Sequence, residues 1–146
     1  MRRILLASDF SKASRRAYAT ALQTAKRNRA TLTILHVMAP VVPVTPDVYV
    51  AFDAWDEVEK QARDWAQRQL GKLTVAAQKA GVRAVGVVAQ GVAAREIVRT
   101  ARRRRADLVI IGTHGRTGLA KLMLGSVAAG VIATARCPVM TVRGRA

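Results

Sequence analysis

This 146-residue chain lacks several features that would assign it to a common class of protein. It has one cysteine, Cys137, which excludes an internal disulfide framework and a cysteine-rich metal site. No apolar run approaches the roughly 20 residues needed to cross a bilayer. The apolar stretch near the N-terminus stops before Asp9, which is too short for the h-region of a signal peptide, about 7–15 residues long. We therefore expect a cytoplasmic protein that does not enter a membrane.

Acidic residues are also scarce, because 9 Asp and Glu stand against 25 Lys and Arg, for a net charge of +16. Such an imbalance indicates attraction to nucleic acid or another polyanion, or else arginine-rich helix faces that are only solvated. The basic residues gather in two clusters, at 12–29 and at 95–105. Six of the nine acids lie between Asp47 and Asp64.

Apolar runs alternate with helical patterns along the whole chain. Five strand-like runs separated by four helices indicate an open α/β sheet of parallel strands with right-handed connections. Nothing indicates a repeat or a second domain, so we expect one domain over residues 1–146. The expected strands are 3–8, 31–37, 82–89, 106–111 and 138–142, and the expected helices are 12–28, 53–80, 93–104 and one that ends near residue 135.

Two of the helices have a predicted cap and a predicted buried face. Ser11 is expected to cap the helix at 12–28, and Asp53 the helix at 53–80. In the longer helix both tryptophans are expected to be core residues. The predicted buried faces consist of Ala17, Ala21, Leu22 and Ala25 in the first helix, and of Trp55, Val58, Ala62, Trp65, Leu73, Ala76 and Ala80 in the second.

Between the second strand and the second helix, residues 38–52 hold three of the four prolines. Such a segment cannot form a regular helix or a central strand. A loop of this length is often functional. We expect either a mobile lid over a ligand or a loose connector.

A glycine-rich turn follows the apolar run at 108–111. Gly112 and Gly115 flank Thr113 and His114, and Gly125-Ser126 follows nine residues later, at the start of the last helical pattern. Glycines let backbone N–H groups approach an anion, and a helix N-terminus adds further N–H groups and a positive dipole end. The turn lies at the carboxyl end of a strand, where open α/β sheets bind ligands. It matches neither the P-loop nor the dinucleotide fingerprint, so the pattern predicts a phosphate site of another kind.

In these residues the chain resembles the universal stress protein family. The spacing Gly112-x2-Gly115-x9-Gly125-Ser126 is the nucleotide motif of the family's ATP-binding branch. The segments ILLASD at 4–9, LHV at 35–37, ADLVIIGTHG at 106–115 and CPVMTV at 137–142 also fit. The resemblance therefore runs through the whole chain in order.

The resemblance implies a three-layer α/β fold with sheet order 3-2-1-4-5, Rossmann-like and of the adenine nucleotide alpha hydrolase-like type. It also implies bound ATP, with or without Mg²⁺, and a role as a stress-response sensor or regulatory binding module. Carried over by position, the adenosine end would meet Ala7, Ser8, Asp9 and the backbone of Val37. The ribose and phosphate end would meet Gly112, Thr113, Gly115, Arg116, Gly125, Ser126 and Val127.

Carboxylates are too few near this site for efficient phosphoryl transfer. Asp9 is the one acid expected there, whereas the reaction needs groups that hold Mg²⁺ and orient a nucleophile. We therefore expect a binding module with no catalytic residues and no metal site of its own, and keep a slow ATPase as the alternative. His36 is expected to be a packed core residue, His114 a phosphate or structural contact, and Cys137 a small buried hydrophobe.

The expected topology also bears on partners. With order 3-2-1-4-5, the helices that carry the two basic clusters lie on opposite faces, which favours diffuse charge over a nucleic-acid groove. Non-specific, salt-sensitive binding to nucleic acid stays open. The last strand, 138–142, is an apolar edge that would be an aggregation hazard if exposed, so we expect it to pair with its copy in a homodimer. Regulatory protein partners are expected, but the sequence does not identify them.

Overall fold

A computed structural model describes residues 1–40, 52–113 and 124–143 of the chain. The described helices and strands alternate, as the sequence predicts. They are β1 (Arg3–Ala7), α1 (Lys12–Asn28), β2 (Thr31–Met38), α2 (Phe52–Lys79), β3 (Ala84–Gln90), α3 (Ala93–Arg103), β4 (Leu108–Gly112), α4 (Ser126–Thr134) and β5 (Val139–Val142).

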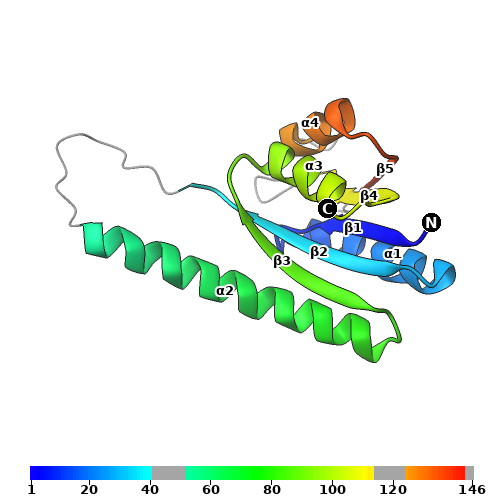
Figure 1. The fold of residues 1–146 in the computed structure, drawn as a ribbon, viewed down its shortest axis with the longest axis horizontal. Helices are drawn as coiled ribbons and strands as arrows, with labels where there is room; N and C mark the ends of the chain where they lie inside the picture. The colour runs from blue at the N-terminus through cyan, green and yellow to red at the C-terminus, as the bar shows by residue number, and fades with distance from the viewer. Residues whose placement is uncertain (41–51, 114–123, 144–146) are drawn as a thin grey trace.

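The five strands form one sheet in the order β3-β2-β1-β4-β5, and each pair of neighbours is parallel. The predicted strand order is therefore confirmed. β1 lies at the centre, and its Ala7 is paired with Leu35 of β2 on one side and with Ile111 of β4 on the other. From β1 the chain adds β2 and then β3 on one side, and it then crosses back to add β4 and β5 on the other side of β1 (Figure 1).

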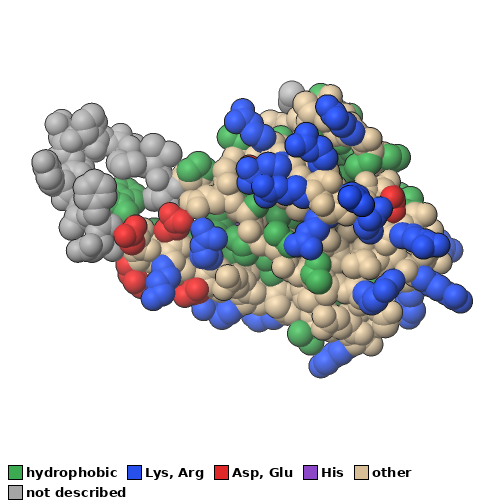
Figure 2. All heavy atoms as spheres, viewed as in Figure 1, with side chains coloured by type: hydrophobic (Ala, Val, Ile, Leu, Met, Phe, Trp, Pro, Cys, Tyr) green, Lys and Arg blue, Asp and Glu red, His purple; other side chains and the backbone are tan. Residues whose placement is uncertain are grey.

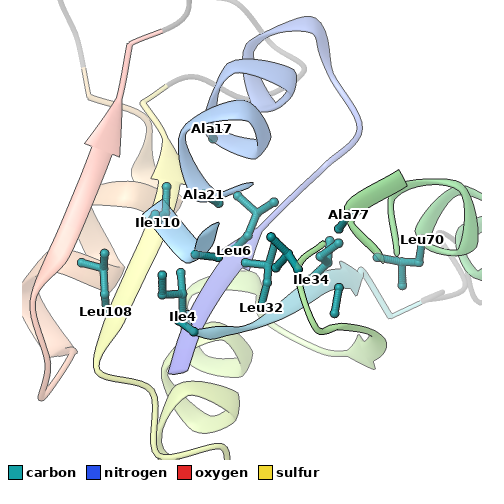
Figure 3. Close-up of a cluster of buried hydrophobic side chains, with 14 residues drawn as sticks. Ile4, Leu6, Ala17, Ala21, Leu32, Ile34, Leu70, Ala77, Leu108 and Ile110 are labelled. Carbon is teal, nitrogen blue, oxygen red and sulfur yellow. The ribbon is translucent and has the colours of Figure 1, made fainter. Parts of the chain in front are cut away.

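Two helices cover each face of the sheet. Alternate residues of a strand point to opposite faces, so Ile4 and Leu6 of β1 pack with α1 and α2, while Leu5 and Ala7 pack with α3 and α4. Both faces are buried, which explains why the central strands are continuous apolar runs. Figure 3 shows the cluster under α1 and α2, which includes Ile4, Leu6, Ala17, Ala21, Leu32, Ile34, Leu70, Ala77, Leu108 and Ile110.

The first helix is capped and packed as predicted. The Ser11 side chain accepts a hydrogen bond from the Ser14 N–H at 3.2 Å, which satisfies one of the free donors of the first turn. Ala17, Ala21 and Ala25 are buried against the sheet.

The predicted face of the second helix is largely wrong, although Leu73 packs against the core as predicted. Val58 and Trp65 are 53% and 39% exposed, and Trp65 is therefore not a core residue. The buried residues of α2 are Ala66, Leu70 and Ala77. The reason is that α2 packs along β3 and β2 at one edge of the sheet, so only a narrow stripe of the helix is covered. The predicted cap is also wrong, since α2 begins at Phe52 and Asp53 lies inside its first turn.

The loop predicted as a lid or connector, residues 38–52, lies mostly outside the described residues. Its described ends are Met38, the last residue of β2, and Phe52, the first residue of α2. Within the described part of the chain, none of the helices combines the length and the apolar character that crossing a bilayer would require.

Candidate functional site

The sequence-predicted site lies where the strand order reverses. β1 and β4 are neighbours in the sheet, and the chain leaves them at Ser8 and Thr113 respectively. Residues that follow parallel neighbours share one edge of the sheet, and a crevice opens where their connections diverge to opposite faces. The sheet thus brings Ser8 and Asp9 close to Gly112 and Thr113, although a hundred residues separate them in the chain.

The turn after β1 is fixed by its own side chains. The Ser8 N–H donates to the Leu35 carbonyl at 2.9 Å, which extends the ladder with β2 by one residue. The Ser8 hydroxyl accepts from the Phe10 N–H at 3.2 Å and lies 3.3 Å from the Ser14 hydroxyl. Asp9 Oδ1 accepts from the Ser11 N–H at 3.0 Å. Asp9 therefore has a structural part in this turn, in addition to the ligand contact that the sequence predicts for it.

Three aromatic rings support this turn from the face that α1 and α2 cover. Phe10 stacks on His36 with ring centroids 4.5 Å apart, and Trp65 of α2 meets the Phe10 ring edge-on at 5.3 Å. His36 is buried, as predicted, and its Nδ1 lies 2.9 Å from the Ser8 carbonyl oxygen. Phe10 has φ of 62°, a conformation that a bulky residue rarely adopts without such support.

This aromatic cluster was missed by the sequence analysis. The only available signal was the aromatic residue directly after Asp9, and its partners come from β2 and α2. On the opposite face of the sheet, Ala7 and Val37 pack in the cluster under α3 and α4. The rings therefore hold the turn from behind, and Ala7 and Val37 lie on the same face as α4.

Two hydrogen bonds place the start of α4 beside the end of β4. The Thr113 N–H donates to the Val142 carbonyl at 3.0 Å, and the Gly125 N–H donates to the Thr113 carbonyl at 2.8 Å. The glycines at 112 and 125, which the sequence motif spaces far apart, are thereby adjacent to the same residue. This contact holds a helix N-terminus beside the carboxyl ends of β1 and β4.

The first turn of α4 is open to an anion. Its N-cap is Gly125, which has no side chain to accept from the helix, and the first turn contains no acidic residue. The first N–H groups of a helix have no partner within it, and they form the positive end of its dipole. Ser126 and Val127 are exposed there. Because Gly125 is the cap, Ser126 is the first helical residue and its hydroxyl is free of the N-cap role.

The remaining predicted contacts, Gly115 and Arg116, lie outside the described residues, as does His114. In the described ranges, no three His, Cys, Asp or Glu side chains come close enough together to hold a metal ion. Of the residues there that end β1, β2 and β4 or begin α4, only Asp9 carries a carboxylate.

Comparisons with known proteins agree along nearly the whole chain. Residues 1–143 match the model of the universal stress protein family. Universal stress protein MJ0531 of Methanocaldococcus jannaschii is 35% identical over 143 residues, which cover 97% of this chain and 82% of the relative. Universal stress protein YxiE of Bacillus subtilis is 34% identical over 145 residues, covering 97% and 98%.

Solved structures show the same fold at lower identity. The hypothetical protein MJ0577 has a TM-score of 0.85 at 23% identity, with 99% of this chain and 97% of that chain covered. A universal stress protein in complex with cAMP has a TM-score of 0.71 at 23% identity, covering 99% and 98%. One from Archaeoglobus fulgidus in complex with dAMP has a TM-score of 0.69 at 22% identity, covering 97% and 98%. By fold and by sequence, this chain belongs to the universal stress protein family.

Proposed function

We propose that the chain is an ATP-binding module, with or without Mg²⁺, that acts as a sensor or regulator in a stress response. The observation that carries the proposal is the hydrogen bond from Gly125 to Thr113, which holds the N-terminus of α4 beside the carboxyl end of β4, the neighbour of β1. The cAMP and dAMP complexes of two solved family structures support an adenine nucleotide as the ligand.

The described residues fit a nucleotide in two parts. Ala7, the turn at Ser8 and Asp9, and the backbone of Val37 would meet the adenosine part at the carboxyl ends of β1 and β2. The open first turn of α4 offers N–H groups to the phosphates. ATP would supply an anion whose charge matches that turn. In the proposal the phosphate end is held by Gly112, Thr113, Gly115, Arg116, Gly125, Ser126 and Val127.

We propose binding without efficient hydrolysis. Asp9 already accepts a hydrogen bond from Ser11, and phosphoryl transfer needs further groups to orient a nucleophile and stabilise developing charge. The bound state would instead change the stability of the protein or its choice of regulatory partner, since a ligand stabilises the conformation that it binds.

The proposal includes a cytoplasmic location and a homodimer paired through the edge strand at 138–142. The support for the dimer is the position of β5, which follows β4 at the end of the strand order.

The test uses Ser126, the first residue of α4. Ser126→Asp places a negative charge where the helix dipole favours it by about 0.3–1 kcal/mol, so the folded state is retained. The same charge repels a triphosphate. We expect isothermal titration calorimetry to show at least about tenfold weaker ATP binding, equivalent to about 1.4 kcal/mol.

Ser126→Asn is the matched control, because it changes the size of the side chain without its charge. It should bind ATP nearly as the wild type does, and adenosine should bind all three proteins alike because it carries no phosphate. Equal ATP affinity in the Asp and Asn variants would contradict the proposed phosphate position. Wild-type protein that neither releases ATP on denaturation nor binds it on titration would refute the function.

A further inference from the structure

A pocket of about 470 Å³ runs along α3 to the amino ends of β4 and β5, away from the carboxyl ends that carry the proposed nucleotide site. It opens between α3 and the turn that joins α4 to β5. Ala106 on its wall precedes β4, and Cys137 precedes β5, so both lie at the amino ends of their strands. The lining consists of Arg95, Val98, Arg99, Ala101, Arg102, Arg105, Ala106, Thr134, Ala135, Arg136 and Cys137.

Five arginines make this pocket strongly positive. In the described part of the chain only Arg99 among them has an ion pair, at 2.8 Å from the buried carboxylate of Glu96. The other acid next in sequence to a lining residue, Asp107, accepts hydrogen bonds from the backbone N–H groups of Arg2 and Arg3 at 2.6 and 2.9 Å. Figure 2 shows Lys and Arg side chains gathered over α3, while Asp and Glu gather near the start of α2.

The helix dipole explains only part of this arrangement. Basic residues are favourable in the last turn of a helix, which accounts for Arg102. Arg136 directly follows the end of α4, where the dipole also favours a positive charge, whereas Arg95 belongs to the first turn of α3, where a positive charge is unfavourable. Arg105 has φ of 49°, a conformation normally left to glycine or asparagine. Arg95 and Arg105 thus line the pocket from positions that local backbone and helix stability do not favour.

The pocket also has an apolar floor. Val98, Ala101, Ala106, Ala135 and Cys137 belong to the cluster under α3 and α4 or pack against it. Burial, and then the charge of Asp107, raise the pKa of the Cys137 thiol, so the floor is uncharged at neutral pH. A pocket of this volume with a few charged groups over apolar walls suits a small organic molecule.

We propose that this pocket is a second binding site, which takes a small organic phosphate whose apolar or flat body rests on the floor while its phosphate meets the arginines. Guanidinium groups bind phosphate through paired charge-assisted hydrogen bonds. Among the described residues, the lining includes no aromatic side chain, so they provide no stacking surface of the kind with which proteins hold single-stranded nucleic acid. Nucleic acid is therefore an outcome of the test and not the proposed ligand.

Cys137 allows ligand binding to be detected at the pocket itself, because it is the only cysteine of the chain and lines the pocket. The measurement is the rate at which N-ethylmaleimide alkylates the full-length protein, followed by mass spectrometry. The probe is 1-naphthyl phosphate, which combines a flat apolar body with a phosphate. We expect it to slow alkylation at least severalfold, with half the effect at or below about 1 mM. Inorganic phosphate and 1-naphthol, each half of the probe, should protect far less.

Two double variants separate the effect of the pocket arginines on protection from the effect of the protein's net charge. Arg102→Gln with Arg136→Gln removes two lining arginines, whereas Arg103→Gln with Arg104→Gln removes the same charge from exposed residues outside the lining. With the first pair of substitutions, the probe concentration that gives half the protection should rise about tenfold or more, as expected for two lost charge-assisted hydrogen bonds. The second pair should change it little.

Three results would overturn the proposal. They are no protection of the wild type, equal weakening in the two double variants, or protection by a single-stranded oligonucleotide as effective as that by the probe. Ser126→Asp protein should be protected like the wild type. The outcome is therefore independent of whether the nucleotide site is confirmed.

Discussion

Ser8 shows how one small residue can organise the end of a strand. Its four polar contacts reach Leu35, Phe10, Ser14 and His36, which come from β2, the turn itself and α1. The side chain is buried, so each of these contacts replaces hydrogen bonds that water would otherwise make. Ser8 therefore holds the turn that carries Asp9 in place.

Asp107 has a comparable part at the other end of the sheet, and its contribution should depend on pH. Its carboxylate accepts from the backbone N–H groups of Arg2 and then Arg3, and these bonds lower the pKa of Asp107. A carboxyl group whose pKa is lower in the folded state stabilises the protein above its unfolded-state pKa, about 4. That stabilisation is lost as the pH falls through the folded-state pKa.

Asp107→Asn should accordingly be less stable than the wild type at pH 7, and the difference should shrink steadily as the pH falls below about 4. Urea unfolding at a series of pH values measures it. Asp64→Asn is the control, because it removes the same charge from a side chain of α2 that takes part in none of the described side-chain hydrogen bonds or ion pairs. A difference between wild type and Asp107→Asn that does not change with pH would contradict the assigned role of the carboxylate.

At the scale of elements, α3 and α4 approach each other closely at Gly130. A Cβ placed on Gly130 of α4 would lie 2.9 Å from the Cβ of Ala94 in α3. Because both atoms are fixed to backbone, the helices themselves would have to move apart. The absence of a side chain at Gly130 is therefore a packing requirement.

Gly130→Ala and Gly71→Ala form a matched pair that tests this requirement. Alanine in a helix interior is favoured over glycine by about 0.5–1 kcal/mol. At Gly71 of α2 a new Cβ meets nothing within 4 Å, so that variant should gain about this amount. At Gly130 overpacking, typically about 1–3 kcal/mol, should outweigh the gain. Urea unfolding at one protein concentration compares the two, and equal stabilisation would show that α3 and α4 have room to spare.

How far the sequence could predict the elements is clearest in β1 and α2. The central strands are buried on both faces, so their continuous apolar runs left little ambiguity, and the sheet order followed from the family resemblance. In α2 more residues are apolar than the narrow contact with β2 and β3 needs. Periodicity could not tell that Leu70 is buried while Val58 and Trp65 are exposed. That choice depends on where the helix sits over the sheet.

The candidate site shows the same limit. The glycine spacing predicted a phosphate site, and the fold does place Gly112 and Gly125 on either side of Thr113. The ring cluster of Phe10, His36 and Trp65 could not be predicted, because each ring comes from a different part of the chain and no spacing relates them. Tertiary contacts between distant segments leave no periodic pattern in a sequence.

For the whole molecule, the parallel topology places basic residues at one end of the sheet, where the strands begin. Every helix of such a sheet ends beside the amino ends of the strands, and the last turns of α1, α2 and α3 carry basic residues there. The two basic clusters lie on opposite faces, as predicted, yet they meet at this end. Their last-turn members are Lys26, Arg27, Arg102 and Arg103, and Lys79 of α2 adds a further charge at the same end. Anions are therefore drawn to the end that contains the arginine pocket.

The edge of the sheet should decide the oligomeric state. The Pro138 carbonyl accepts a hydrogen bond from the N–H of Val109 in β4, and the Val142 carbonyl accepts one from the N–H of Thr113, which follows β4. Because strand residues alternate, the backbone N–H and C=O of Val139 and Thr141 face the open edge. Met140 is 38% exposed. An edge of this kind is a template for a second copy, so we expect a mass of roughly twice 15.8 kDa at micromolar concentration.

Thr141→Pro tests this pairing without disturbing the ladder to β4, since proline removes only an N–H that faces outward. We expect light scattering after gel filtration to give a monomeric mass for this variant, with a circular dichroism spectrum like that of the wild type. Thr141→Val keeps the N–H and the shape of the side chain, and should remain dimeric. A wild type that is monomeric at micromolar concentration would refute the dimer. A dimer that survives Thr141→Pro would place the interface on another surface.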